Sequence, residues 1–133
     1  MSVPVIHEDD AEELDLPGRH LLWLVSPELL GARHMSVCMI RVPSGETVRP
    51  AHSHPNGEEA IYIIQGSGRV LVGNDVALVR AGATVLFPQG AVHMLQNTGS
   101  EEMKVICFFA PATNLENYKF FEDVEFPPAA ADK

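Results

Sequence analysis

HSHPNGEEAIYIIQG, residues 52–66, combines the features from which the fold and the site of this chain can be predicted. Two histidines stand one residue apart, and in an extended strand such residues point to the same face. His52 and His54 therefore present two imidazoles on one side. The turn at 55–58 contains proline and Asn-Gly, which are typical of tight turns, and a second strand follows. We expect this hairpin to bring the carboxylate of Glu59 beside the two histidines.

A third imidazole completes a candidate metal site. His93 lies in another predicted strand, 92–97, after a turn that contains glycine. Three imidazoles and one carboxylate suit Fe(II), Mn(II), Ni(II), Co(II) or Zn(II), and the general order of affinities does not select among these ions. Four protein ligands leave open positions on a six-coordinate ion, which is typical of a catalytic site and not of a structural one. The residue pattern thus predicts one divalent transition metal per subunit, with four ligands: His52, His54, Glu59 and His93.

Two spaced motifs make the chain resemble the cupin superfamily. The first motif, a glycine, HxH, a glutamate and a glycine, has a first gap that is one residue longer than usual. Its positions here are Gly45, His52, His54, Glu59 and Gly66. The second motif is met at every spacing by GATVLFPQGAVHMLQN, with motif positions Gly82, Pro88, Gly90, His93 and Asn97. The spacer at 67–81 has the short length that is typical of small bacterial-type cupins.

The resemblance implies an all-β fold, a double-stranded antiparallel β-helix or jelly-roll barrel with the metal inside. By matching position it implies the same four ligands, and it gives structural roles to the other motif residues: Gly66, Gly82, Pro88, Gly90 and Asn97. For Asn97 a turn role at the end of a strand is favoured over a place facing the pocket. The expected organisation is an acidic N-terminal segment at 1–18, a cupin barrel at 19–112 and a C-terminal arm at 113–133.

Strand and turn signals along the chain independently indicate a β-sandwich or barrel. About nine short strands are predicted, at 20–26, 33–42, 46–54, 59–65, 69–72, 76–80, 84–88, 92–97 and 103–110. Pro50 favours an edge or loop position for 46–54. Several strands are apolar on both faces, as in EAIYIIQ at 59–65, so they need an outer cover. A partner subunit packed sheet on sheet is the expected cover, which predicts a homodimer, and the tail segments are the alternative.

The two adjacent glutamates are expected to differ in role. Only Glu59 meets the six-residue gap to Gly66, because Glu58 leaves seven residues. Consecutive strand residues also point to opposite faces, so only one of the two can join the histidines. Glu58 is then a turn residue at the mouth of the barrel and a weak candidate for a proton shuttle.

Composition excludes several classes of function. The 133-residue chain has a net charge of −9, but six of its 18 acidic residues lie at 8–15, and the rest has 12 acidic against 9 basic residues. The basic residues are scattered, which disfavours nucleic acid as a partner. No uninterrupted apolar span and no secretory signal are found, so a membrane is not expected as a partner. Cys38 and Cys107 lie in apolar runs, which fits buried thiols and a cytoplasmic location.

The interior face can be assigned by strand parity. Ile61, Ile63 and Gln65 share a face with Glu59, and Leu95 shares one with His93. Phe87 or Leu86 is expected at the mouth of the pocket. The second predicted strand contributes one of two sets: Met35, Val37 and Met39, or Ser36, Cys38 and Ile40. The pocket is therefore expected to be largely apolar beyond its metal.

Four functions fit this pocket. The first is a dioxygenase-like enzyme acting on a small organic substrate, because an apolar wall excludes water from reactive intermediates. The second is a metal-dependent isomerase, lyase or decarboxylase acting on a sugar or hydroxy acid, which needs a second inward polar group. Glu58, Gln65 and Arg49 are the candidates for that group. The third is a non-catalytic module that binds a metal or small ligand, and the fourth is a structural barrel that does not use its motif.

Overall fold

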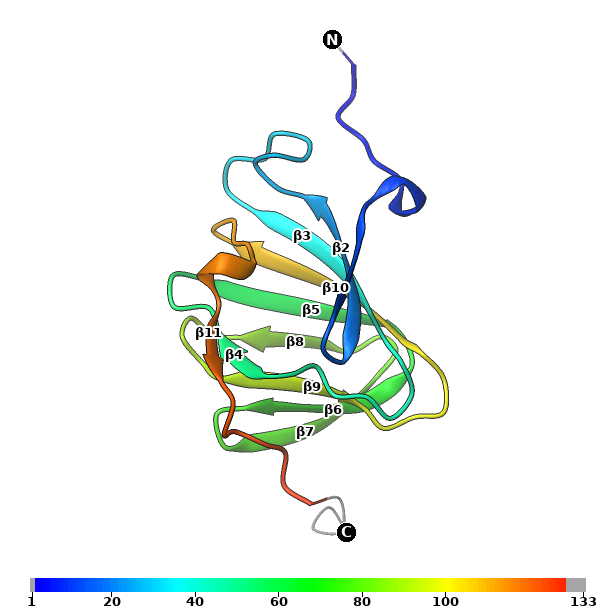
Figure 1. The fold of residues 1–133 in the computed structure, drawn as a ribbon, viewed down its shortest axis with the longest axis vertical. Coiled ribbons are helices and arrows are strands. Elements are labelled where there is room, and N and C mark those ends of the chain that lie inside the picture. Colours follow the sequence, from blue (N-terminus) through cyan, green and yellow to red (C-terminus); the bar gives the residue numbers. More distant parts are fainter. Residues whose placement is uncertain (1, 129–133) are drawn as a thin grey trace.

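The computed structural model describes residues 2–128, which form two antiparallel β-sheets that face one another (Figure 1). One sheet has six strands in the order β1-β2-β3-β10-β5-β8, and the other has five in the order β11-β4-β9-β6-β7. The strands are β1 (Glu13–Leu16), β2 (Arg19–Val25), β3 (Ser36–Val42), β4 (Ala51–Ser53), β5 (Glu58–Gln65), β6 (Ser67–Val72), β7 (Asp75–Arg80), β8 (Thr84–Phe87), β9 (His93–Asn97), β10 (Met103–Ala110) and β11 (Lys119–Phe121). Two 3-10 helices are short, η1 (Glu8–Asp10) and η2 (Leu115–Asn117). The jelly-roll architecture predicted from the sequence is confirmed.

All nine predicted strands are present, with ends shifted by a few residues, and two more strands extend the sheets. Strand β1 comes from the acidic segment and pairs with β2, and β11 comes from the C-terminal arm and pairs with β4. Both are too short to stand out as strands in the sequence. None of the helices within residues 2–128 is long and apolar enough to cross a membrane.

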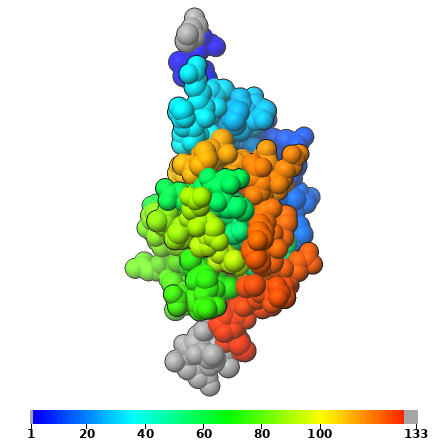
Figure 2. Space-filling view, turned by 90° about the vertical axis from the view of Figure 1, so that its left-hand side faces the viewer, coloured from blue at the N-terminus to red at the C-terminus, as the bar shows by residue number. Residues whose placement is uncertain are grey.

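Of the two positions that Pro50 predicts for residues 46–54, edge or loop, the structure shows a loop up to Pro50. Strand β4 begins after Pro50 and lies between β9 and β11, with His52 opposite His93 on one side and Phe120 on the other. The proline lies outside the ladder, so its missing N–H group leaves no ladder hydrogen bond unmade. The C-terminal segment (orange to red in Figure 2) runs along the outside of the barrel, where β11 takes the edge position.

The core lies between the two sheets, and strand alternation decides which residues enter it. In β5, Ile61 and Ile63 are buried, whereas Tyr62 and Ile64 are 42% and 46% exposed. The same period of two is seen in β10, where Val105 and Cys107 are buried. The sequence predicts apolar residues on both faces of β5. In the structure its inner face is buried and its outer face is exposed to solvent.

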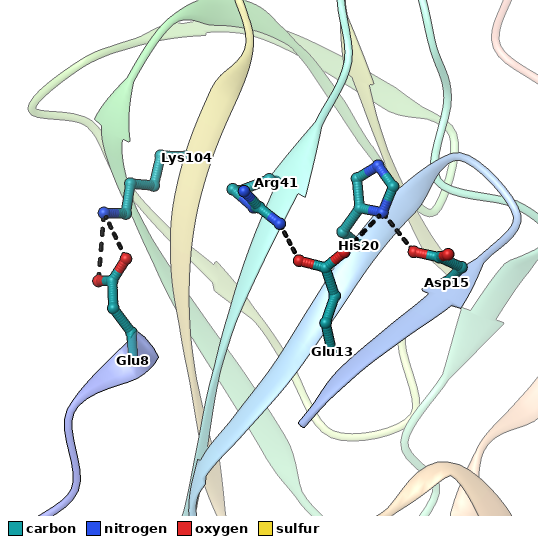
Figure 3. A network of polar contacts seen from close by, with 6 residues as sticks. All are labelled: Glu8, Glu13, Asp15, His20, Arg41 and Lys104. Carbon is teal, nitrogen blue, oxygen red and sulfur yellow. Dashed lines mark hydrogen bonds and ion pairs between the residues drawn. The ribbon is translucent and has the colours of Figure 1, made fainter. Parts of the chain in front are cut away.

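Three acidic residues of the N-terminal segment pair with basic residues of the sheet (Figure 3). Glu8 forms an ion pair with Lys104 of β10, and Glu13 forms one with Arg41 of β3. Asp15 lies 2.5 Å from the ring of His20 on β2. These pairs are exposed or half-buried, so they fix the path of the segment more than they stabilise the fold.

Asn97 closes the last turn of the second sequence motif with three hydrogen bonds. Its Nδ2 donates to the carbonyl oxygens of Val42 and Glu101, each at 2.8 Å, and its Oδ1 accepts from the Gly99 amide at 2.9 Å. Asn97 is 1% exposed and lies away from the pocket. The structural role predicted for this residue is therefore confirmed.

We predict that Asn97→Ala lowers the free energy of unfolding by about 3 kcal/mol, because it leaves buried backbone groups without partners. Urea denaturation followed by circular dichroism measures the change. Asn74→Ala, at an exposed turn position, serves as the matched control and is expected to leave the stability unchanged. Equal stability of the two variants would contradict the role given to Asn97.

Candidate metal centre

Three neighbouring segments bring the four predicted ligands together inside the barrel. His52 lies in β4, His54 follows its end, Glu59 lies in β5 and His93 begins β9. One ligand atom from each residue lies within 4.8 Å of the others, and all four side chains are buried. The residue pattern thus predicted this group correctly. We call it the HHEH group.

Backbone hydrogen bonds fix the two loops that carry the group. The carbonyl oxygen of His54 accepts from the amides of Gly57, at 3.3 Å, and Gly90, at 3.1 Å. The turn between the histidines and Glu59 is thereby joined to the loop that precedes His93. Gly90 has φ of +77°, a conformation that side-chain-bearing residues rarely adopt. The glycine required by the second motif therefore has a local structural reason.

Two of the imidazoles are oriented by the carbonyl groups of the residues two positions before them. Nδ1 of His52 lies 3.1 Å from the Pro50 oxygen, and Nδ1 of His93 lies 3.0 Å from the Ala91 oxygen. A carbonyl oxygen only accepts hydrogen bonds, so each Nδ1 carries the proton. In the neutral rings, each Nε2 therefore has a free lone pair, as a metal ligand requires.

The carboxylate of Glu59 occupies the centre of the group. Its Oε1 lies 2.8 Å from Nε2 of His54 and 3.2 Å from Nε2 of His93. Nε2 of His93 is buried and forms no hydrogen bond, so its lone pair faces a carboxylate oxygen at close range. This juxtaposition of two acceptors is unfavourable unless a cation lies between them. The donor set and its orientation thus fit a divalent transition metal.

The protonation states of His52 and Glu59 also suit a metal. Burial, and the neighbouring His93, lower the pKa of His52 to about 3. Burial alone would raise the pKa of Glu59, but the imidazoles of His54 and His93 beside its carboxylate outweigh burial and lower that pKa to about 2. Near neutral pH the imidazole of His52 is therefore neutral and the carboxylate of Glu59 is ionised, which are the forms that coordinate metals.

A small cavity of about 40 Å³ lies beside the HHEH group. Strands β2, β3, β5, β9 and β10 each contribute two residues that stand two positions apart, as expected for one face of a strand. Its walls are mainly apolar, formed by Leu21, Cys38, Ile40, Val48, Ile61, Phe87, Leu95, Cys107 and Phe109. The predicted apolar pocket is thus confirmed.

Strand parity left two alternatives open, and the structure decides both. The second predicted strand contributes Cys38 and Ile40 to the cavity, and the mouth position falls to Phe87 because Leu86 is 56% exposed. The inward position predicted for Gln65 was wrong. The register between β5 and β10 shifts next to this residue, and its side chain is exposed and donates to the Glu102 carbonyl.

None of the three polar candidates from the sequence lines this cavity. Glu58 is exposed at the start of β5, and Arg49 is exposed and paired with Glu125. Two polar residues that were not predicted from the sequence line the cavity instead, Arg19 and Tyr118. Arg19 shares a face of β2 with Leu21, so extending the predicted strand by one residue would have found it.

Tyr118 comes from the C-terminal arm and packs on the histidines. Its ring stacks on His52 with centroids 4.8 Å apart and meets His54 edge-on at 4.5 Å. Burial next to Cys38 and Glu59 raises the pKa of the Tyr118 phenol well above its ordinary value, so the phenol is protonated near neutral pH. No signal in the sequence placed this residue, because the arm has no extended periodic pattern.

Comparisons with known proteins agree with this geometry. The chain is 27% identical over 105 residues to an uncharacterized protein of Methanocaldococcus jannaschii, covering 79% of this chain and 83% of that protein. It is 33% identical over 87 residues to germin-like protein 1-1 of Oryza sativa, covering 59% of this chain. This chain spans about two fifths of that relative, 39% of its length.

Among solved structures, the oxalate decarboxylase of Lactobacillus farciminis, as a formate complex, superposes with a TM-score of 0.77 at 22% identity. The match covers 86% of this chain and 35% of that one, and at this identity it supports the fold alone. The family model for the cupin domain matches residues 38–109, which is more than half of the chain and includes the whole HHEH group. The chain therefore belongs to the cupin family.

Proposed function

We propose that this protein is a metal-dependent enzyme that acts on a small organic substrate. The observation that supports it is the HHEH group, buried at the side of a small apolar cavity. His52, His54, Glu59 and His93 would hold one divalent transition metal per subunit, Fe, Mn, Ni, Co or Zn. When bound, such an ion would supply Lewis acidity or redox chemistry next to the cavity.

The residues around the site have separate tasks in this proposal. The carbonyls of Pro50 and Ala91 hold the imidazoles of His52 and His93 in one orientation, so that little reorganisation is needed. Phe87 stacks on His93 with centroids 4.0 Å apart and limits its movement. The apolar walls exclude water, which strengthens electrostatic interactions inside the cavity.

The apolar walls favour dioxygenase-like chemistry as the first candidate, because they exclude water from the reacting centre. A second candidate is a metal-dependent isomerase, lyase or decarboxylase. It is favoured by Tyr118, whose phenol lines the cavity and can donate a hydrogen bond to a substrate oxygen. The fold shared with an oxalate decarboxylase is consistent with this second candidate.

We also propose that the protein is a homodimer. Tyr62, Ile64, Leu86 and Phe108 are exposed large apolar residues of the neighbouring strands β5, β8 and β10. Leu86 and Phe108 both lie opposite Ala60, which places them in one row across the outer face of the sheet. A second subunit packed on this face would remove these side chains from water. A cytoplasmic location is the accompanying proposal, supported by the two free thiols.

The two adjacent glutamates provide a direct test of the metal site. Glu59→Ala removes a central ligand and is expected to lower metal affinity at least about tenfold. Glu58→Ala, its matched control at an exposed position, is expected to keep the metal content of the wild type. Elemental analysis of protein purified without added metal, followed by titration with Zn(II), measures both. Loss of metal in the Glu58 variant with retention in the Glu59 variant would contradict the proposed ligand set.

Oxygen dependence separates the two candidate reactions. We predict that protein reconstituted with Fe(II) consumes oxygen when a library of small organic substrates is screened with an oxygen electrode. Every active compound is then assayed again under strict anaerobiosis. Turnover without oxygen would exclude the dioxygenase-like reaction and favour the proton-transfer reactions. If no compound is turned over in either assay, the result would favour the third function, a non-catalytic module that binds a metal.

The proposed dimer predicts a mass of twice the 14.5 kDa chain in light scattering at micromolar concentration. Leu86→Glu places a charge on the proposed interface and is expected to give monomers. Leu78→Glu changes a leucine that is also exposed, at 76%, but lies on β7 of the other sheet, and is expected to remain dimeric. A monomeric wild type, or equal effects of both substitutions, would disprove this interface.

A further inference from the structure

Arg19 is a buried cation at the wall of an otherwise apolar cavity. It begins β2, it is 7% exposed, and its side chain lines the cavity beside the HHEH group. Its Nη1 donates to the carbonyl oxygens of Pro17 and Arg49, both at 3.1 Å. These two carbonyls belong to segments far apart in the sequence, so the guanidinium is held in place from two sides.

The remaining donors of this guanidinium are not used. Among the described residues 2–128, Arg19 forms hydrogen bonds through Nη1 alone and has no ion pair with a carboxylate. The groups near it are Tyr118, Cys38, Cys107 and Glu59. Of these four groups only Glu59 is a carboxylate, and it lies against the imidazole of His54 at 2.8 Å. A buried charge without an opposite charge is unfavourable, so this site favours an anion from outside the chain.

The arrangement of the unused N–H donors of Arg19 indicates which kind of anion would bind to it. Nε–H and Nη2–H lie on one edge of the planar guanidinium, and this edge matches the two oxygens of a carboxylate. The cavity of about 40 Å³ accepts only a few non-hydrogen atoms, and most of its other lining residues are apolar. These features favour a short carboxylic acid over a sugar, which would leave several hydroxyl groups without partners.

We propose that the substrate of the site is a small organic acid whose carboxylate binds to Arg19. The inference rests on the proposed function and deepens it by naming the substrate class. Arg19 is then the residue that selects for a negative charge on the substrate. The apolar walls select for a substrate whose part beyond the carboxylate is small and apolar. The walls also keep water from the ion pair, so charge recognition is stronger than it would be at the surface.

The test compares acetate with acetamide, which have nearly the same shape but differ in charge. Both are titrated at constant ionic strength into the Zn(II)-loaded protein, and binding is followed by NMR chemical shifts. Acetate is expected to bind at least about tenfold more tightly than acetamide, as for a charge-assisted pair. Equal affinities, or no detectable binding of acetate, would overturn the proposal.

Two variants assign the effect to Arg19. Arg19→Met is expected to lose the preference for acetate, whereas Arg49→Met removes an exposed arginine near the same segment and is expected to retain it. Wild-type binding of acetate by Arg19→Met would overturn the proposal. Arg19→Lys keeps the charge but not the planar edge, so an intermediate affinity is expected. If the Arg19 variants do not fold, the comparison of acetate with acetamide on the metal-free wild type decides the question, because acetate then has no Zn(II) to bind.

Zn(II) content separates this inference from the proposed function. A protein that binds one Zn(II) per chain but shows no preference for acetate would retain the proposed metal site and exclude the acid substrate. A protein that binds no Zn(II) would contradict the proposed function. The affinities of the metal-free protein for acetate and for acetamide would then test the role of Arg19 independently of the metal.

Discussion

The pairing of β4 with β9 is the constraint on which the site depends. It places His52 directly opposite His93, and a carbonyl two residues before each histidine fixes the ring so that Nε2 faces inward. Nε2 of His93 then lies 3.2 Å from the carboxylate of Glu59 in a buried space and forms no hydrogen bond there. This juxtaposition of two acceptors is unfavourable in itself, so the fold must stabilise it by other means or by a bound cation.

The rest of the molecule supports that space from two directions. The Gly57 and Gly90 amides bind the same His54 carbonyl and hold the two loops together. On the open side of β4, the C-terminal arm adds β11 and lays Tyr118 against the imidazole of His52. A segment outside the two sequence motifs thus closes the site. Such segments can differ between proteins that share a fold, so the shape of the cavity does not follow from the fold alone.

The sequence predicted the parts of the structure that depend on local patterns. The HxH spacing and the tight turn before Glu59 predicted three members of the HHEH group, and the second motif predicted His93. Strand parity was sufficient for most of the apolar wall. The misses came from contacts between distant segments. Tyr118 reaches the site through a three-residue strand, and Gln65 leaves the inner face because β10 shifts its register beside it. Neither contact leaves a periodic signal in the chain.

The central claim is that His52, His54, Glu59 and His93 bind one metal ion. A crystal of protein purified without added metal, measured at the absorption edge of each candidate ion, tests it most directly. The account predicts one anomalous peak per chain, about 2.0–2.2 Å from the Nε2 atoms and the Glu59 carboxylate. A fully occupied site elsewhere, or no peak at the HHEH group after soaking with Zn(II), would contradict it.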